Sequence, residues 1–183
     1  ITRRRFTQAS MVAPIVMSLA SRPVLGQGNQ CTTSGLESGN HSGVNEVSCE
    51  GCSPGYWKNH PDSWSTSGYN PSETFDFNNP DDPNNGTLFS QVFNISNQSP
   101  YWGLTLMQVL KLKGNADPHE LGFHTVATLL NAAVIGPPTF GYTKSEVITI
   151  YNTWNGTAEE LKFKFENLHD DSPLYPWITC PLN

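Results

Sequence analysis

The chain has 183 residues, and its hydrophobic fraction of 37% and charged fraction of 14% both lie below the roughly 45–50% and about 25% of ordinary globular domains. This length favours one modest domain with an appended segment, while 15 glycines and 14 prolines indicate many loops and argue against a long coiled coil. All four arginines lie within residues 1–26, so residues 27–183 carry six lysines against sixteen acidic residues, a net charge of −10. That balance excludes nucleic acid as a partner, because phosphate contacts need clustered Lys and Arg.

Residues 1–26 combine a basic head with an apolar stretch. The head contains Arg3, Arg4 and Arg5, and the apolar side chains that follow include Met11, Val12, Ile15, Val16, Met17 and Leu19. A basic head, a short apolar run and a small-residue end predict an export signal, and the Thr-Arg-Arg order resembles the twin-arginine export motif of bacteria. Because Pro14 and polar residues interrupt the run, the pattern indicates passage through a membrane rather than a stable span.

The same segment has a second interpretation, in which it is retained. Phe6-Thr7 followed by apolar residues resembles the start of a type IV pilin, although Ser10 stands where such pilins carry Glu and no Gly precedes Phe6. The resemblance implies only an analogous use: a helix over residues 6–25, about 30 Å long, that packs against copies of itself. Arg3 to Arg5 would then pair with acidic residues of a neighbouring subunit.

The remainder divides into a linker and a domain. Residues 27–48 are rich in Gly and Ser without apolar periodicity, which predicts an extended arm, and residues 49–183 predict an α-rich domain. Within the domain we expect a short apolar turn at residues 88–93 and two longer helices at residues 102–113 and 119–134. Two further helices, at residues 143–154 and 157–168, are expected to begin at capping boxes. Strand alternation is weak throughout, and residues 65–86 predict a turn-rich loop.

Four cysteines, Cys31, Cys49, Cys52 and Cys180, indicate two disulfides in an exported chain, with three pairings open. A Cys52–Cys180 bond would tie the start of the domain to its end, and a Cys31–Cys49 bond would staple the arm. The alternative is a zinc site formed by Cys49, Cys52 and a nearby histidine. Support for it is weak, because only one pair of cysteines has the spacing of zinc ligands. We therefore expect a mainly α fold: a hydrophobic N-terminal helix, an extended linker and a loop-rich, disulfide-closed helical domain.

Several separated motifs within residues 49–183 occur in the order found in a domain of many bacterial extracellular proteins. They are the Cys-Ser-Pro-Gly-Tyr-Trp-Lys-Asn-His opening, a Thr-Leu helix ending at Gly, a His-x-Val-Ala-x-Leu-Leu-Asn-Ala-Ala helix, a Tyr-Thr turn and a terminal Cys-Pro-Leu (52–60, 105–114, 124–133, 142–148 and 180–182). The chain resembles this family, which has no known activity to carry over, and departs from it at Phe123, where Arg is usual. The resemblance implies a secreted, disulfide-closed surface module.

The opening motif also supplies a candidate ligand surface. One or two helical turns would bring together the side chains of Tyr56, Trp57, His60 and Trp64. Such an aromatic group could bind a surface glycan. The alternative, which we favour, is that the aromatic rings form core in a chain with few aliphatic residues while His60 caps a helix.

Catalytic signals are weak. No Gly-x-Ser-x-Gly motif or free cysteine nucleophile is evident. His124, on an apolar helix, is better explained as a buried, hydrogen-bonded side chain. Paired carboxylates such as Asp81-Asp82 fit solvent-exposed surfaces. We expect no enzyme activity, metal or cofactor.

Our leading hypothesis is a structural subunit of an extracellular bacterial filament that polymerises with itself through the N-terminal helix. The alternative is a secreted surface binding module, exported by the twin-arginine route with residues 1–26 removed, that recognises a glycan.

Overall fold

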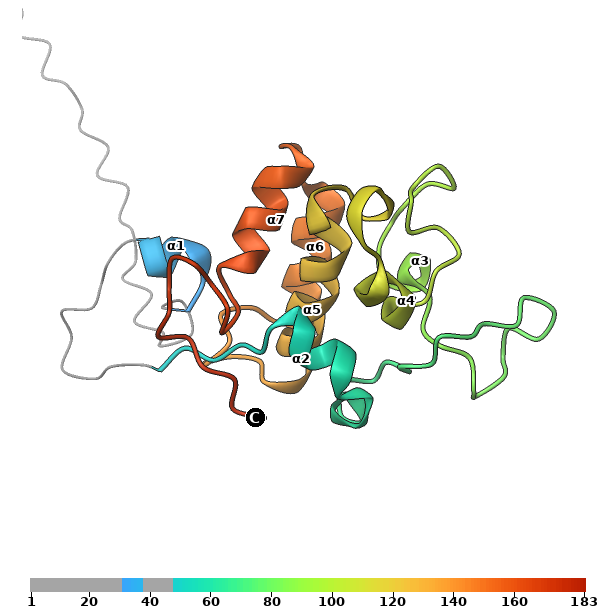
Figure 1. Cartoon of the computed structure of the whole chain (residues 1–183), viewed down its shortest axis with the longest axis horizontal. Helices are drawn as coiled ribbons and strands as arrows, with labels where there is room; N and C mark the ends of the chain where they lie inside the picture. Colours follow the sequence, from blue (N-terminus) through green and yellow to red (C-terminus); the bar gives the residue numbers. More distant parts are fainter. Residues whose placement is uncertain (1–30, 38–47) are drawn as a thin grey trace, which may run out of the picture.

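The computed structural model describes residues 31–37 and 48–183, and they form a helical domain with long connections (Figure 1). The helices, in chain order, are α1 (Thr33–Glu37), α2 (Pro54–Asn59), the 3-10 helix η2 (Pro61–Trp64), α3 (Phe89–Val92), α4 (Leu106–Lys111), the 3-10 helices η3 (Gly114–Ala116) and η4 (Pro118–Glu120), α5 (Leu121–Val134), α6 (Lys144–Thr153) and α7 (Ala158–Glu166). In these residues β structure is limited to two isolated bridges, Glu50–Thr179 and Leu88–Thr105. The prediction of a mainly α, disulfide-closed domain is therefore confirmed.

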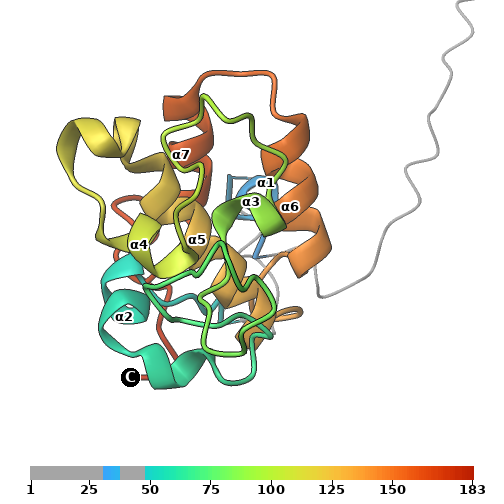
Figure 2. The same ribbon diagram turned by 90° about the vertical axis from the view of Figure 1, so that its right-hand side faces the viewer.

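Helix α5 is the centre of the domain. It contacts α2, α4, α6 and α7, and Figure 2 shows it surrounded by these helices when the molecule is turned by 90°. Eleven of its fourteen residues are buried, including Val126, Leu129 and Leu130, because other helices pack against several of its sides. Helices α2, α4, α6 and α7 each contribute buried apolar residues to this core.

Asn131 of α5 connects this helix to the opening motif. Its Oδ1 accepts hydrogen bonds from the Cys52 amide at 2.9 Å and the Trp57 indole at 3.0 Å, and its Nδ2 donates to the Cys52 carbonyl at 2.8 Å. Asn131 is completely buried, so these bonds satisfy groups that would otherwise lose their water partners without replacement. The contact between residues 52–57 and α5 is therefore specified by one side chain.

Two helix starts differ from the sequence expectation. The helix expected over residues 102–113 begins only at Leu106, since Thr105 is its N-cap and forms a capping box with Gln108. The helix expected over 119–134 begins at Leu121, because His119 and Glu120 have positive φ values of 59° and 57° and interrupt the backbone. The two later capping boxes, at Thr143 and Thr157, are confirmed as the starts of α6 and α7.

Part of the expected linker is also structured. Residues 31–37 were expected in an extended arm, but Thr33–Glu37 form α1, and Cys31, Thr33 and Leu36 are buried. The backbone of Cys31 lies so close to Gly141 that a Cβ atom at position 141 would overlap it. The expectation failed because α1 is stabilised by this distant contact and carries no helical signal of its own.

The disulfides join Cys31 to Cys49 and Cys52 to Cys180, and no described cysteine is free. Cys49 and Cys52 are therefore not available as zinc ligands. Within residues 31–37 and 48–183, no helix is both long enough and apolar enough to cross a membrane. Two disulfides are typical of an oxidising extracellular or periplasmic environment.

Candidate functional site

The aromatic residues of the opening motif lie in the core. Trp57 and Trp64 are 0% exposed and Tyr56 is 8% exposed, and the Trp64 indole donates to the Trp57 carbonyl at 3.1 Å. His60 stacks on the Tyr56 ring with centroids 4.2 Å apart, and its Nδ1 lies 2.9 Å from the Tyr56 carbonyl oxygen. The structure thus brings Tyr56, Trp57, His60 and Trp64 together, but neither tryptophan presents a face on which a sugar could stack.

The predicted assembly residues, Arg3, Arg4, Arg5, Met11, Val12, Ile15, Val16, Met17 and Leu19, lie outside the described residues. The structure supplies no contact for them. The N-terminal helix and its charge pairing accordingly stay predictions.

His124 of α5 and His169, in the turn that follows α7, form a buried pair. Their rings are nearly parallel with centroids 5.5 Å apart, and the two Nδ1 atoms are separated by 3.4 Å. The Thr128 hydroxyl donates to the His124 carbonyl oxygen, which leaves its oxygen to accept from His169 Nε2 at 3.0 Å. In the neutral tautomers that satisfy both contacts, His169 donates from Nε2 to Thr128 and accepts at Nδ1 from His124.

Burial favours the neutral form of both histidines. It lowers the pKa of His124 to about 4, although Glu166, whose carboxylate lies 3.9 Å from His124 Nε2, opposes the shift. Burial and then the neighbouring His124 lower the pKa of His169 well below its usual value. Lys162 pairs with Glu166 at 2.7 Å. A general base would need access to a substrate, and these rings are 4% and 0% exposed, so the pair serves the core.

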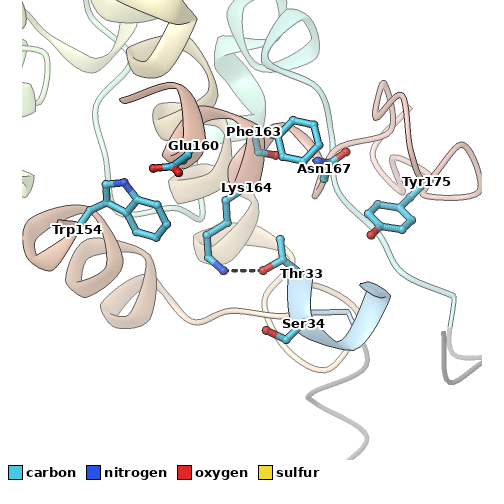
Figure 3. Close-up of a pocket in the computed structure, with 8 residues that line it drawn as sticks. All are labelled: Thr33, Ser34, Trp154, Glu160, Phe163, Lys164, Asn167 and Tyr175. Carbon is cyan, nitrogen blue, oxygen red and sulfur yellow. Dashed lines mark hydrogen bonds between the residues drawn. The ribbon is translucent and has the colours of Figure 1, made fainter. Parts of the chain in front are cut away.

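A solvent-open pocket of about 210 Å³ lies between α1, the start and middle of α7, and the C-terminal loop (Figure 3). Its lining includes three aromatic side chains, Trp154, Phe163 and Tyr175, and five polar ones, Thr33, Ser34, Glu160, Lys164 and Asn167. Trp154 follows the end of α6, and Phe163 projects from α7 with 47% of its surface exposed. Segments distant in sequence therefore combine into one aromatic and polar hollow.

Lys164 occupies the inner side of this pocket. Its ammonium donates to Thr33 Oγ1 at 2.6 Å and lies 5.7 Å from the centre of the Tyr142 ring. Among the described residues no carboxylate lies within 4.0 Å of it, whereas Lys111 and Lys162 each pair with a glutamate. The described residues supply no hydrogen-bond acceptor to its other two ammonium protons, which can therefore donate to a ligand.

Glu160 supplies a second charge, one helical turn away from Lys164. One of its oxygens, Oε2, accepts from the Thr157 amide at 2.7 Å and the Thr157 hydroxyl at 3.1 Å, because Glu160 completes the capping box of α7. The other oxygen has no hydrogen-bond donor in the described part of the chain. The pocket therefore offers both donors and an acceptor beside aromatic rings.

Sequence reasoning missed this pocket. One signal was present: Phe163 lies two residues from Leu161 and from Phe165, which are the buried residues of α7, so it falls off the apolar face of that helix. Phe163 is therefore an aromatic side chain on the polar face of an amphipathic helix. Nothing in the sequence places Trp154 or Tyr175 beside it.

No group of three or more His, Cys, Asp or Glu side chains in residues 31–37 and 48–183 is arranged to hold a metal ion. Comparison with protein families, with curated proteins and with solved structures finds no match to this chain.

Proposed function

We propose that this protein is a structural subunit of an extracellular bacterial filament or surface assembly. In this proposal the apolar residues within 6–25 pack against their copies in the interior, and the acidic helical domain covers the outside. Burial of apolar surface at about 25 cal/mol per Å² drives association, and a repeated non-closing contact extends it into a polymer.

The observation that supports this proposal best is the way the domain holds residues 31–37. The Cys31–Cys49 disulfide attaches this segment covalently, and three residues further on Cys52 is bonded to Cys180 near the C-terminus. Tension exerted on residues 1–30 would thus reach both ends of the domain through covalent bonds. In a subunit whose N-terminal segment is held by its neighbours, these crosslinks would keep the domain from unfolding under that pull.

Non-covalent contacts reinforce the attachment. The Thr33 amide donates to the Tyr142 hydroxyl at 3.3 Å, and Thr33 Oγ1 lies 3.0 Å from the same hydroxyl. Lys164 adds its hydrogen bond to Thr33, so α1 is connected to both α7 and the loop before α6. The net charge of −10 on residues 27–183 complements the basic residues 3–5, which favours contacts between subunits.

The proposal is tested with the full chain in detergent-free buffer, by sedimentation and negative-stain microscopy. We expect filaments, and we expect the double substitution Val12→Lys and Val16→Lys, which puts two charges on one helical face, to abolish them. The matched control is Gln27→Lys with Gln30→Lys, which adds the same two charges after the apolar run and should preserve filaments.

Material sheared from the producing cells supplies the second measurement. Filaments that contain the peptide spanning Arg5 and Arg22 support the proposal. A monomer whose first residue lies near Gln27 would instead identify an exported module with its signal removed, and the assembly proposal would be wrong.

A further inference from the structure

The chemistry of the pocket between α1 and α7 restricts what can occupy it. Its volume of about 210 Å³ equals that of about seven water molecules and lies below the range of about 300–1,000 Å³ that is usual for drug-sized ligands. One six-membered ring with its substituents fills such a space. A longer molecule would have to continue into solvent beyond it.

The charges of the pocket select against ligands that carry a net charge of one sign. An anion that approaches Lys164 also meets the Glu160 carboxylate, and the net charge of −10 on residues 27–183 repels it further. A cation that approaches Glu160 meets the Lys164 ammonium. A purely apolar ligand would remove water from both charged groups without replacing their hydrogen bonds. A neutral ligand with several hydroxyl groups avoids all three penalties.

The aromatic rings specify the shape of that ligand. The C–H face of a pyranose ring packs against an aromatic ring, which buries apolar surface on both partners, and its equatorial hydroxyls act as donors and acceptors around the edge. Lys164 supplies donors and Glu160 Oε1 supplies an acceptor for these hydroxyls. We propose that the pocket binds one neutral hexopyranose unit of an extracellular polysaccharide, with Trp154 as the stacking platform.

The platform is held in place before a ligand arrives. The Trp154 indole donates to the Thr157 carbonyl at 2.9 Å, and the ring lies against Gly156, where a Cβ atom would come within 2.9 Å of Nε1. The same Cβ would come within 2.6 Å of Glu160 Oε2. Gly156 therefore allows the tryptophan and the carboxylate to adopt these positions, and a platform that is already fixed loses little entropy on binding.

This inference does not depend on polymerisation, although an assembly would strengthen its effect. A single sugar in a pocket of this size binds with a Kd on the order of 1 mM. Many copies in one filament, meeting many sugar units in one polysaccharide, raise the avidity by two or more orders of magnitude. The pocket would then attach the assembly to a matrix.

The test uses the full chain, by affinity electrophoresis in gels containing a neutral glucan, a neutral mannan, a neutral galactan or acidic polygalacturonate. We expect retardation by at least one neutral polysaccharide, confirmed by isothermal titration calorimetry with the matching oligosaccharide. Trp154→Ala and Lys164→Met should each weaken binding at least tenfold. Gly156→Ala should weaken it as well, because the added methyl displaces Trp154 and Glu160 while every ligand-contacting side chain is kept.

Matched controls lie away from the pocket. Trp102→Ala removes a tryptophan that is 51% exposed, and Lys113→Met removes an exposed lysine, and both should leave binding unchanged. Thermal unfolding of each variant shows whether a loss of binding is due to misfolding. If Trp154→Ala or Lys164→Met misfolds, Phe163→Ser, at an exposed site, provides a further pocket variant.

Three results would overturn the proposal: no binding to any of the neutral polysaccharides, binding only to polygalacturonate, or binding that survives both Trp154→Ala and Lys164→Met. The assembly proposal is judged separately, because filament formation should respond to Val12→Lys with Val16→Lys and not to Trp154→Ala. Loss of one property can therefore be observed while the other persists.

Discussion

The buried histidine pair shows how single residues make the stability of this domain sensitive to pH. Burial keeps each ring neutral in the folded state, with His169 donating to Thr128 and His124 donating to His169. A proton added to His169 at Nδ1 would meet the proton that His124 donates there, and a proton added to His124 at Nε2 would place a charge in a region from which water is excluded. Glu166 could stabilise a charged His124, but Lys162 already neutralises that carboxylate.

We therefore expect the free energy of unfolding to fall as the pH is lowered from about 6.5. Unfolded histidines take up a proton near that pH, whereas the pKa of His124 in the folded state is about 4 and that of His169 is also lowered. Each histidine contributes a slope of about 1.4 kcal/mol per pH unit in the interval between its unfolded and folded pKa values. Asp171, whose pKa is raised by burial, acts in the opposite direction.

Urea denaturation at pH 7, 6 and 5 measures this slope. The substitution His169→Gln should make the slope smaller, whatever it does to stability at pH 7, because one of the two titrating groups is removed. His60→Gln, at an exposed histidine, serves as the control and should retain the slope. An unchanged slope in His169→Gln would show that the pair does not control the pH response.

Among the elements, α5 illustrates how a helix start is determined by a side chain outside it. Asp117 is 2% exposed, and its Oδ1 accepts from the Gly122 amide at 2.8 Å and the Tyr101 hydroxyl at 2.7 Å, while Oδ2 accepts from the Phe123 amide at 2.9 Å. The carboxylate thus satisfies two of the amides that every helix start leaves without partners. Short 3-10 turns at residues 114–120 bring the chain back so that Asp117 can reach them.

The substitution Asp117→Ala should lower the free energy of unfolding by about 2–4 kcal/mol, since it removes three hydrogen bonds to a buried carboxylate. Asp117→Asn should have a smaller effect, because its amide oxygen can still accept from Gly122 and Tyr101. Glu120→Ala, at an exposed residue beside the same helix start, is the control. Chemical denaturation measures all three, and equal stability of Asp117→Ala and the parent chain would refute the assigned role.

On the scale of the whole molecule, the two disulfides are attached to one short segment, at Cys49 and at Cys52. Gly51 donates to the Thr179 carbonyl at 2.9 Å and Thr179 donates to the Cys49 carbonyl at 3.3 Å, so residues 49–51 and the C-terminal loop lie side by side between the two bonds. One disulfide spans 18 positions of the sequence and the other spans 128. They therefore constrain very different lengths of unfolded chain.

Replacing Cys52 and Cys180 by alanine should reduce the free energy of unfolding by about 5 kcal/mol, and replacing Cys31 and Cys49 should reduce it by about 3 kcal/mol, because the longer loop loses more entropy on closure. The second replacement should also expose residues 31–37 to protease, since α1 is short and relies on its attachment. Denaturation with limited proteolysis compares the two, and a larger loss for the Cys31–Cys49 pair would contradict this order.

Several features of this protein were determined by local sequence. The capping boxes at Thr143 and Thr157 predicted the starts of α6 and α7, because a side chain and an amide three residues apart form them without help from the rest of the chain. Burial of the opening aromatics was likewise expected from a composition poor in aliphatic residues. Four cysteines in a chain with an export-like N-terminus predicted two disulfides, but their number alone left three pairings open.

Only the tertiary structure decided how distant segments combine. The disulfide pairing, the helix at Thr33–Glu37 and the delayed start of α5 all depend on contacts between residues that no local pattern relates. The pocket is the extreme case, since it unites α1, the end of α6, α7 and the C-terminal loop. Short-range propensities fix a helix over one or two turns, whereas a binding surface depends on which helices the buried core brings together.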